Sequence, residues 1–195
     1  MNDFIAELIA REDDSITSVI AFATYNPSIG RVLESGGVAK FETIARSLVK
    51  QLSRITSQST FDALHQTTTR KLTDTFTTAR GKPLSYGQAQ KPINVFLKTY
   101  VDWAHRPSPQ IRRRLLPFLH VPLDKILMKT IKSKFADWYR SEIRPHVQVP
   151  QRAFSLSTID EEMYRRWQDF FRQHYPKKPL IFDIAWALNR KPNEA

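Results

Sequence analysis

The stretch YGQAQKPINVFLKTYVDW (residues 86–103) carries the strongest helical pattern in the sequence. Its apolar residues recur at spacings of three and four, which places them on one face of an α-helix. This apolar stripe consists of Ile93, Phe96, Leu97, Tyr100, Val101 and Ala104. Lys91, Asn94, Lys98 and Asp102 fall outside the stripe. We therefore expect a central helix with a buried apolar face and with Lys91 at its beginning.

Helical patterns also extend over most of the remaining chain. Apolar residues keep helical spacing at residues 3–24, 38–55, 57–79 and 123–143, and the first stretch holds one or two helices because acidic residues 12–14 divide it. Thr158 and Glu161 have the spacing of a capping box, and residues 181–189 have the pattern of a last helix. The sequence predicts an all-α fold, a single domain over residues 1–195 with about eight helices and a loose tail at residues 192–195.

Positive charge is concentrated in the middle of the chain. The whole sequence has 30 Lys and Arg against 19 Asp and Glu, a net charge of +11. Between Arg106 and Arg144 there are ten basic and three acidic residues, so this segment alone carries a surplus of seven. A local surplus of this kind is typical of proteins that bind a polyanion, and nucleic acid is the commonest one. We expect a nucleic-acid partner, with DNA favoured over RNA and with anionic membrane as the main competitor.

Several functional classes are disfavoured by composition. The chain has no cysteine, which removes disulfides, thiolate catalysis and cysteine metal sites and suits a cytoplasmic protein. Its five histidines form no helical i, i+4 pair, and its five glycines form no phosphate-binding loop. No apolar run approaches the roughly 20 residues that a membrane-spanning helix needs. We predict no metal site, no cofactor and no membrane span.

Lys91 and Asp124 form the candidate catalytic pair. A lysine becomes a nucleophile when burial or nearby positive charge lowers the pKa of its amine. Such an amine can attack the anomeric carbon of a nucleotide sugar and form a Schiff base, while a carboxylate stabilises the cationic sugar as the base leaves. The base must first turn out of the duplex into a pocket. Tyr86, Trp103 and Phe118 are the expected aromatic walls of that pocket, since they lie close to the pair in sequence.

Two segments around this pair resemble the helix-hairpin-helix DNA glycosylase superfamily. Gly87-Gln-Ala-Gln-Lys91 stands where the family has its hairpin and lysine, and Val121-Pro122-Leu123-Asp124 stands where it has its aspartate. The separation of 33 residues between the lysine and the aspartate is closest to that of the archaeal 8-oxoguanine DNA glycosylase branch. The resemblance implies a base-excision glycosylase/lyase, with Lys91 as nucleophile and Asp124 as catalytic carboxylate.

The residues around the pair are the expected contacts to nucleic acid. Three consecutive arginines cannot all point the same way on a helix, so we expect them to form a broad basic surface. The predicted contact residues are Gly87, Gln88, Gln90, Lys98, Arg112, Arg113, Arg114, Lys125 and Lys129.

Two other interpretations stay open. In the first, Lys91 is an ordinary surface lysine, Asp124 is only a helix N-cap, and the protein is a non-catalytic module that binds nucleic acid or another protein. In the second, Arg140 followed by five residues and His146 resembles the motif of helical HEPN ribonucleases, with Pro145 directly before the histidine. That resemblance implies cleavage of the RNA backbone by the arginine and the histidine.

Overall fold

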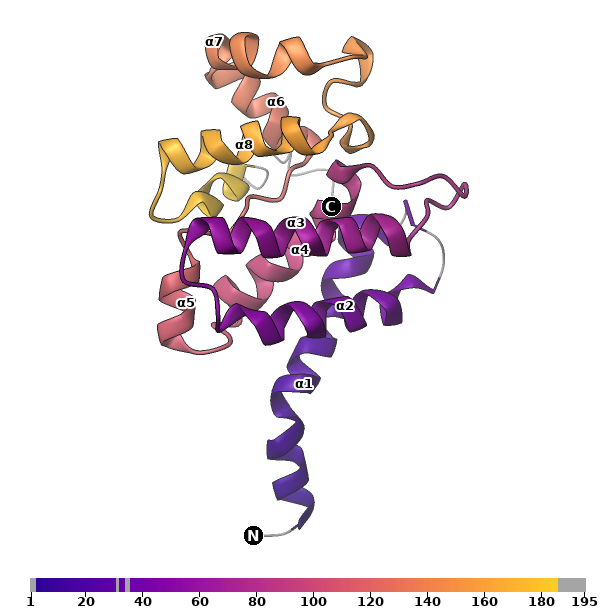
Figure 1. The fold of residues 1–195 in the computed structure, drawn as a ribbon, viewed down its shortest axis with the longest axis vertical. Coiled ribbons are helices and arrows are strands. Elements are labelled where there is room, and N and C mark those ends of the chain that lie inside the picture. Colours follow the sequence, from indigo (N-terminus) through magenta and orange to yellow (C-terminus); the bar gives the residue numbers. More distant parts are fainter. Residues whose placement is uncertain (1–2, 31, 34–35, 186–195) are drawn as a thin grey trace, which may run out of the picture.

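The structure, a computed structural model, describes residues 3–30, 32–33 and 36–185. These residues form a single all-α domain (Figure 1), which confirms the predicted fold class. The α-helices are α1 (Asp3–Tyr25), α2 (Gly37–Leu52), α3 (Gln58–Thr75), α4 (Tyr86–Leu97), α5 (Pro109–Leu115), α6 (Lys125–Lys134), α7 (Ala136–Trp138) and α8 (Glu161–His174). Within the described residues, β-pairing is limited to two isolated bridges, Leu33–Thr78 and Thr77–Pro83.

The hydrophobic core is divided into two clusters. One cluster is built from α1 to α5 and runs from Ile20 to Leu119, with Leu180 added from the C-terminal part of the chain. The other runs from Val121 to Phe171 and contains the apolar faces of α6 and α8. Figure 1 shows α6, α7 and α8 at one end of the molecule and α2 and α5 towards the other. We call α1–α5 the amino-terminal lobe and α6–α8 the carboxy-terminal lobe.

Helix α4 lies at the centre of the fold, as its sequence predicts. The Ser85 side chain accepts a hydrogen bond from the Gln88 N–H, and the Gln88 side chain accepts one from the Ser85 N–H. This reciprocal capping box starts the helix at Tyr86. The apolar stripe is buried from Ile93 to Val101, and a π-helical turn at Lys98–Trp103 continues the helix.

Gly87 lets the two lobes approach closely. Its N–H donates a hydrogen bond to the Ile159 carbonyl over 2.9 Å. A Cβ atom at this position would lie 2.5 Å from the Leu156 carbonyl oxygen and 2.6 Å from the Ile159 Cβ. Both distances are shorter than van der Waals contact, so only glycine fits here without movement of the backbone.

Several predicted element boundaries are wrong in detail. Helix α1 is continuous through the acidic residues 12–14, because their side chains stay exposed. The cap of α8 is Asp160, which accepts the Met163 N–H over 2.8 Å, and not Thr158. The helix predicted at residues 123–143 is interrupted at Phe135, whose φ of −130° and ψ of 56° are not helical. Pro179–Ile184 is a 3-10 helix and Ala185 is helical, whereas residues 186–189 of the predicted last helix and the tail at 192–195 lie outside the described residues.

Candidate functional site

Lys91 lies inside α4 and not at its mouth, so that prediction is wrong. The helix begins at Tyr86, one turn earlier than the resemblance to a hairpin requires. The Lys91 side chain is half-buried. Burial lowers the pKa of its amine, while the charges of Asp124 and Asp183 act to raise it. Lys91 and Asp124 are thus electrostatically coupled, whereas the ion pair formed in this region joins Lys98 Nζ to Asp183 over 2.6 Å.

Asp124 is the N-cap of α6. Its carboxylate accepts a hydrogen bond from the Leu127 N–H over 2.7 Å. This contact satisfies one of the free backbone donors at the beginning of the helix. The prediction that Asp124 caps a helix is therefore confirmed.

The residues assigned to the hairpin make packing contacts and hydrogen bonds within the protein. Gly87 packs against Leu156 and Ile159, and Gln88 closes the capping box of α4. Gln90 is fully buried; its side chain donates to the Gly87 carbonyl over 2.8 Å and accepts from the Asn94 side chain over 2.6 Å. These three residues belong to α4.

The three predicted walls of the base pocket lie in different places. Tyr86 lines a cleft between α3 and α8. Trp103 is 63% exposed, and the Lys98 ammonium lies 4.5 Å from the centroid of its ring. Phe118 packs against the core of the amino-terminal lobe. The structure does not bring these three rings together around one cavity.

Two of the three consecutive arginines bind within the protein. Arg112 lies 3.2 Å from the buried Asp102 carboxylate, and Arg114 donates to the Ser53 carbonyl over 2.7 Å. Arg113 is exposed, as are Lys125 and Lys129 on α6. The broad surface expected from residues 112–114 is therefore reduced to one exposed arginine.

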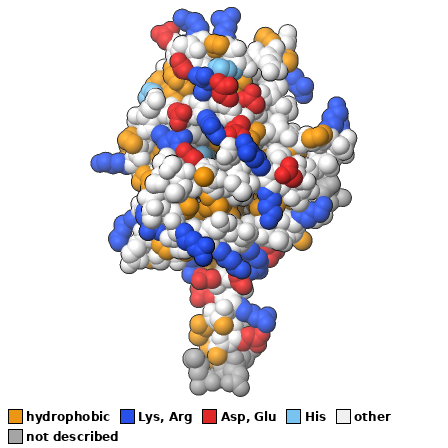
Figure 2. Space-filling model, in the orientation of Figure 1, with side chains coloured by type: hydrophobic (Ala, Val, Ile, Leu, Met, Phe, Trp, Pro, Cys, Tyr) orange, Lys and Arg blue, Asp and Glu red, His pale blue; other side chains and the backbone are white. Residues whose placement is uncertain are grey.

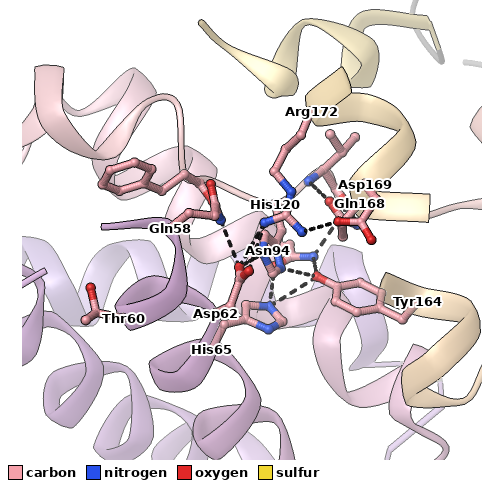
Figure 3. Close-up of polar contacts among 12 residues, drawn as sticks. Gln58, Thr60, Asp62, His65, Asn94, His120, Tyr164, Gln168, Asp169 and Arg172 are labelled. Carbon is pink, nitrogen blue, oxygen red and sulfur yellow. Dashed lines mark hydrogen bonds and ion pairs between the residues drawn. The ribbon is translucent and has the colours of Figure 1, made fainter. Parts of the chain in front are cut away.

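A buried polar network joins the two lobes (Figure 3). Asp62 and His65 come from α3, Asn94 from α4, His120 from the segment between the two core clusters, and Tyr164 from α8. The His120 ring lies 2.7 Å from the Asp62 carboxylate through Nε2 and 2.8 Å from the Tyr164 hydroxyl through Nδ1. The Asn94 side chain donates to the Tyr164 hydroxyl over 2.8 Å and lies 2.7 Å from His65 Nε2.

The protonation of this network follows from its geometry. Burial lowers the pKa of both His65 and His120, so both rings are neutral at neutral pH. Because a carboxylate can only accept, His120 Nε2 donates to Asp62, and Nδ1 accepts the Tyr164 proton. Tyr164 in turn accepts from the Asn94 amide, whose carbonyl oxygen accepts from His65 Nε2. Each of these hydrogen bonds therefore pairs one donor with one acceptor.

The outer end of the network is charged. Arg172 lies 3.0 Å from Asp62 and 3.0 Å from Asp169. Burial acts to raise the pKa of Asp62, but the hydrogen bonds from His120 and Gln58 and the charge of Arg172 outweigh it and lower that pKa to about 2. This end lines the cleft between α3 and α8, which has a volume of about 430 Å³.

The network is suited to holding the lobes together. Burial raises the pKa of Tyr164 well above its ordinary value, so the hydroxyl keeps its proton and is a poor nucleophile. Gln168 of α8 clamps the connecting segment beside the network: its side chain accepts from the Val121 N–H over 2.8 Å and donates to the Val121 carbonyl over 3.0 Å. Satisfied polar groups of this kind fix a unique packing arrangement.

A different cleft, on the carboxy-terminal lobe, combines cations with aromatic rings. It has a volume of about 390 Å³ and no Asp or Glu in its lining. Lys and Arg side chains project at this end of the molecule in Figure 2. We call it the basic cleft; its lining residues are Lys132, Ala136, Tyr139, Arg140, Arg144, Val147, Pro150, Ala153 and Phe154.

The cations of the basic cleft lie beside its rings. The Lys132 ammonium is 5.5 Å from the centroid of Tyr139 and 5.6 Å from that of Phe154. The two ring centroids are 5.8 Å apart. Arg144 is exposed, and Arg140 lies 3.2 Å from Asp137 in an ion pair whose two side chains are both exposed. An exposed pair of this kind is weak, so both arginines are available to an anion.

Tyr139 and Phe154 were not among the residues predicted to form a binding site. Lys132, Arg140 and Arg144 belong to the charged segment 106–144, but they were not among the predicted contact residues. The rings come together only because the chain turns back between Arg144 and Phe154. The pair proposed from the HEPN resemblance is divided: Arg140 lines the cleft, while His146 is absent from its lining and lies 3.8 Å from Glu162.

Neither a metal site nor a membrane span is found in the described part of the chain. No three His, Asp or Glu side chains gather there in a way that could hold a metal ion, and no helix there is long and apolar enough to cross a bilayer. Comparison of the chain with protein-family models, with curated proteins and with solved structures finds no match.

Proposed function

We propose that this protein binds nucleic acid through the basic cleft. The observation that carries the proposal is the combination of Lys132, Arg140 and Arg144 with two aromatic rings in a cleft whose lining holds no carboxylate. Cationic side chains that contact phosphates release condensed counterions, which supplies most of the affinity for nucleic acid. Aromatic faces stack on bases with little sequence preference.

The two aromatic residues of the basic cleft have different roles. Phe154 is half-buried and offers part of its ring to a base, whereas Tyr139 is largely buried beneath Lys132 and supports that side chain. Burial raises the pKa of Tyr139, so its hydroxyl stays uncharged and adds no repulsion towards phosphate. The cleft therefore suits a phosphate chain with unstacked bases.

Binding is tested by fluorescence anisotropy with labelled oligonucleotides over a series of salt concentrations. We expect Arg140→Gln combined with Arg144→Gln to weaken binding and to reduce the salt slope by about 1.4 to 1.8, at 0.7 to 0.9 per lost phosphate contact. Lys50→Gln combined with Arg54→Gln is the matched control, since it removes the same charge from exposed sites on the amino-terminal lobe. Equal losses in the two double variants would show that net charge, and not this cleft, governs binding.

A second candidate function rests on the Lys91 amine. Its lowered pKa and its coupling to Asp124 favour a glycosylase/lyase that forms a Schiff base with the sugar of a damaged nucleotide. Borohydride reduction should then trap a covalent adduct with an oligonucleotide that carries 8-oxoguanine, with an abasic oligonucleotide as the control for non-specific amines. Lys91→Ala should abolish the adduct and retain DNA binding, whereas Lys50→Ala, which removes an exposed amine, should leave trapping unchanged. Trapping by Lys91→Ala at the wild-type level would exclude this candidate.

A further inference from the structure

A second cleft without carboxylates lies on the other side of the segment that closes the basic cleft. Pro150, Ala153 and Phe154 of this segment line the basic cleft, while Arg152 and Ser157 line the second. The second cleft has a volume of about 550 Å³, and we call it the turn cleft. Its lining residues are Val32, Thr78, Ala79, Arg80, Lys82, Pro83, Leu84, Ser85, Gln88, Arg152 and Ser157.

A rigid turn carries two of the three cations of the turn cleft. The Thr78 N–H donates to the Lys82 carbonyl and the Gly81 N–H to the Thr78 carbonyl, both over 2.8 Å. The Lys82 N–H donates to the Thr78 hydroxyl over 3.0 Å. Gly81 has a φ of +69°, a conformation that glycine adopts without strain. Arg80 and Lys82 flank this glycine and are both exposed, so two cations project to solvent from a turn whose backbone is hydrogen-bonded.

The ridge between the clefts is also fixed by its own hydrogen bonds. The Arg152 carbonyl accepts from the Ser155 N–H over 2.8 Å and from the Thr158 hydroxyl over 2.9 Å. The Arg152 N–H donates to the Val149 carbonyl over 2.9 Å. Different residues of this short ridge thus line opposite clefts, with Phe154 in the basic cleft and Arg152 in the turn cleft.

We infer that one single-stranded nucleic acid occupies both clefts and bends over the ridge at residues 150–157. The inference rests on the proposed function and extends it to a substrate class. The two clefts together offer six cations to a phosphate chain and no carboxylate: Lys132, Arg140, Arg144, Arg80, Lys82 and Arg152. A strand that occupies both clefts must bend to cross the ridge at residues 150–157 that separates them. Duplex DNA resists such a bend, with a persistence length of about 150 base pairs, whereas a single strand follows it easily.

The inference is tested by the dependence of binding on strand length. Wild-type protein and two double variants are titrated with labelled oligo(dT) and oligo(rU) of about 4 and about 16 nucleotides, which bracket common site sizes, and with a duplex of the longer length. Arg80→Gln with Lys82→Gln changes the turn cleft, and Arg140→Gln with Arg144→Gln changes the basic cleft. Circular dichroism and thermal unfolding check that each variant keeps its fold.

We expect the basic-cleft variant to weaken binding of both lengths. The turn-cleft variant should weaken binding of the long strand only and reduce its salt slope by about 1.4, at 0.7 per phosphate contact for single strands. The inference is overturned if the turn-cleft variant binds the long strand like wild type, if it weakens both lengths equally, or if the duplex binds as tightly as the single strand. Absence of binding by wild type at either length would instead contradict the proposed function itself. The DNA and RNA arms show which sugar the site prefers.

Discussion

At the scale of single residues, His65 and His120 make the stability of the protein depend on pH. Both imidazoles are buried and neutral, and burial lowers the pKa of each. In the unfolded chain their pKa returns to about 6.5, so the unfolded state takes up more protons than the folded state as the pH falls below that value. Their contribution to stability is therefore complete above pH 6.5 and is lost on acidification.

We expect the free energy of unfolding to decrease as the pH is lowered from 7.5 to 5. Replacement of one of the two histidines, in His120→Gln, should make this decrease smaller, whatever it does to stability at pH 7.5. Urea denaturation at a series of pH values measures both quantities. His174→Gln removes an exposed ring outside the network and should keep the wild-type dependence. An equal pH dependence in wild type and His120→Gln would show that the network does not control acid stability.

At the scale of elements, local patterns predicted the helices better than their ends. The spacing of apolar residues located α4 and its buried stripe, because spacing depends only on neighbours within two turns. The start of α4 depends on the capping box of Ser85 and Gln88. Because the helix therefore begins at Tyr86, Lys91 lies within the helix and not at its N-terminus, where it was predicted. The interruption at Phe135 has no comparable local signal, since its neighbours Lys134 and Ala136 are both ordinary helix formers.

Two capping boxes in the described part of the chain offer a matched comparison. Ser57 caps α3, and Ser85 caps α4 while its hydroxyl also donates to the Leu156 carbonyl over 2.7 Å. Loss of an N-cap costs about 1 kcal/mol, and loss of the second hydrogen bond costs about 1 kcal/mol more. Ser85→Ala should therefore reduce the free energy of unfolding by more than Ser57→Ala. Equal values from chemical denaturation would mean that the contact with Leu156 contributes nothing to stability.

At the scale of the whole molecule, long-range contacts decide what the sequence alone could not reveal. The network brings together residues as far apart as Asp62 and Arg172, and no local spacing signals that meeting. The surplus of positive charge was visible in the sequence. Whether a given Lys or Arg side chain can bind an external anion depends on whether a carboxylate of the protein already pairs with it. Asp102 binds Arg112, whereas the lining of the basic cleft holds no carboxylate.

The residues that hold the two lobes together are different from those proposed to bind nucleic acid. The polar network holds the interface between the lobes, and its groups are occupied with one another. The basic cleft and the turn cleft lie on either side of residues 150–157, away from that network, and their cations are exposed. Stability and the proposed binding activity are therefore expected to respond to different substitutions.

Photo-crosslinking tests the proposed binding site most directly. A single-stranded oligonucleotide that carries 4-thiothymidine is bound to the full chain and irradiated, and the modified peptides are identified by mass spectrometry. We predict crosslinks in the peptide that contains Phe154, whose ring lines the basic cleft and is offered to a base, and their loss in the Arg140→Gln, Arg144→Gln variant. Crosslinks confined to the residues around Lys91 and Asp124, or to the amino-terminal lobe, would contradict the account.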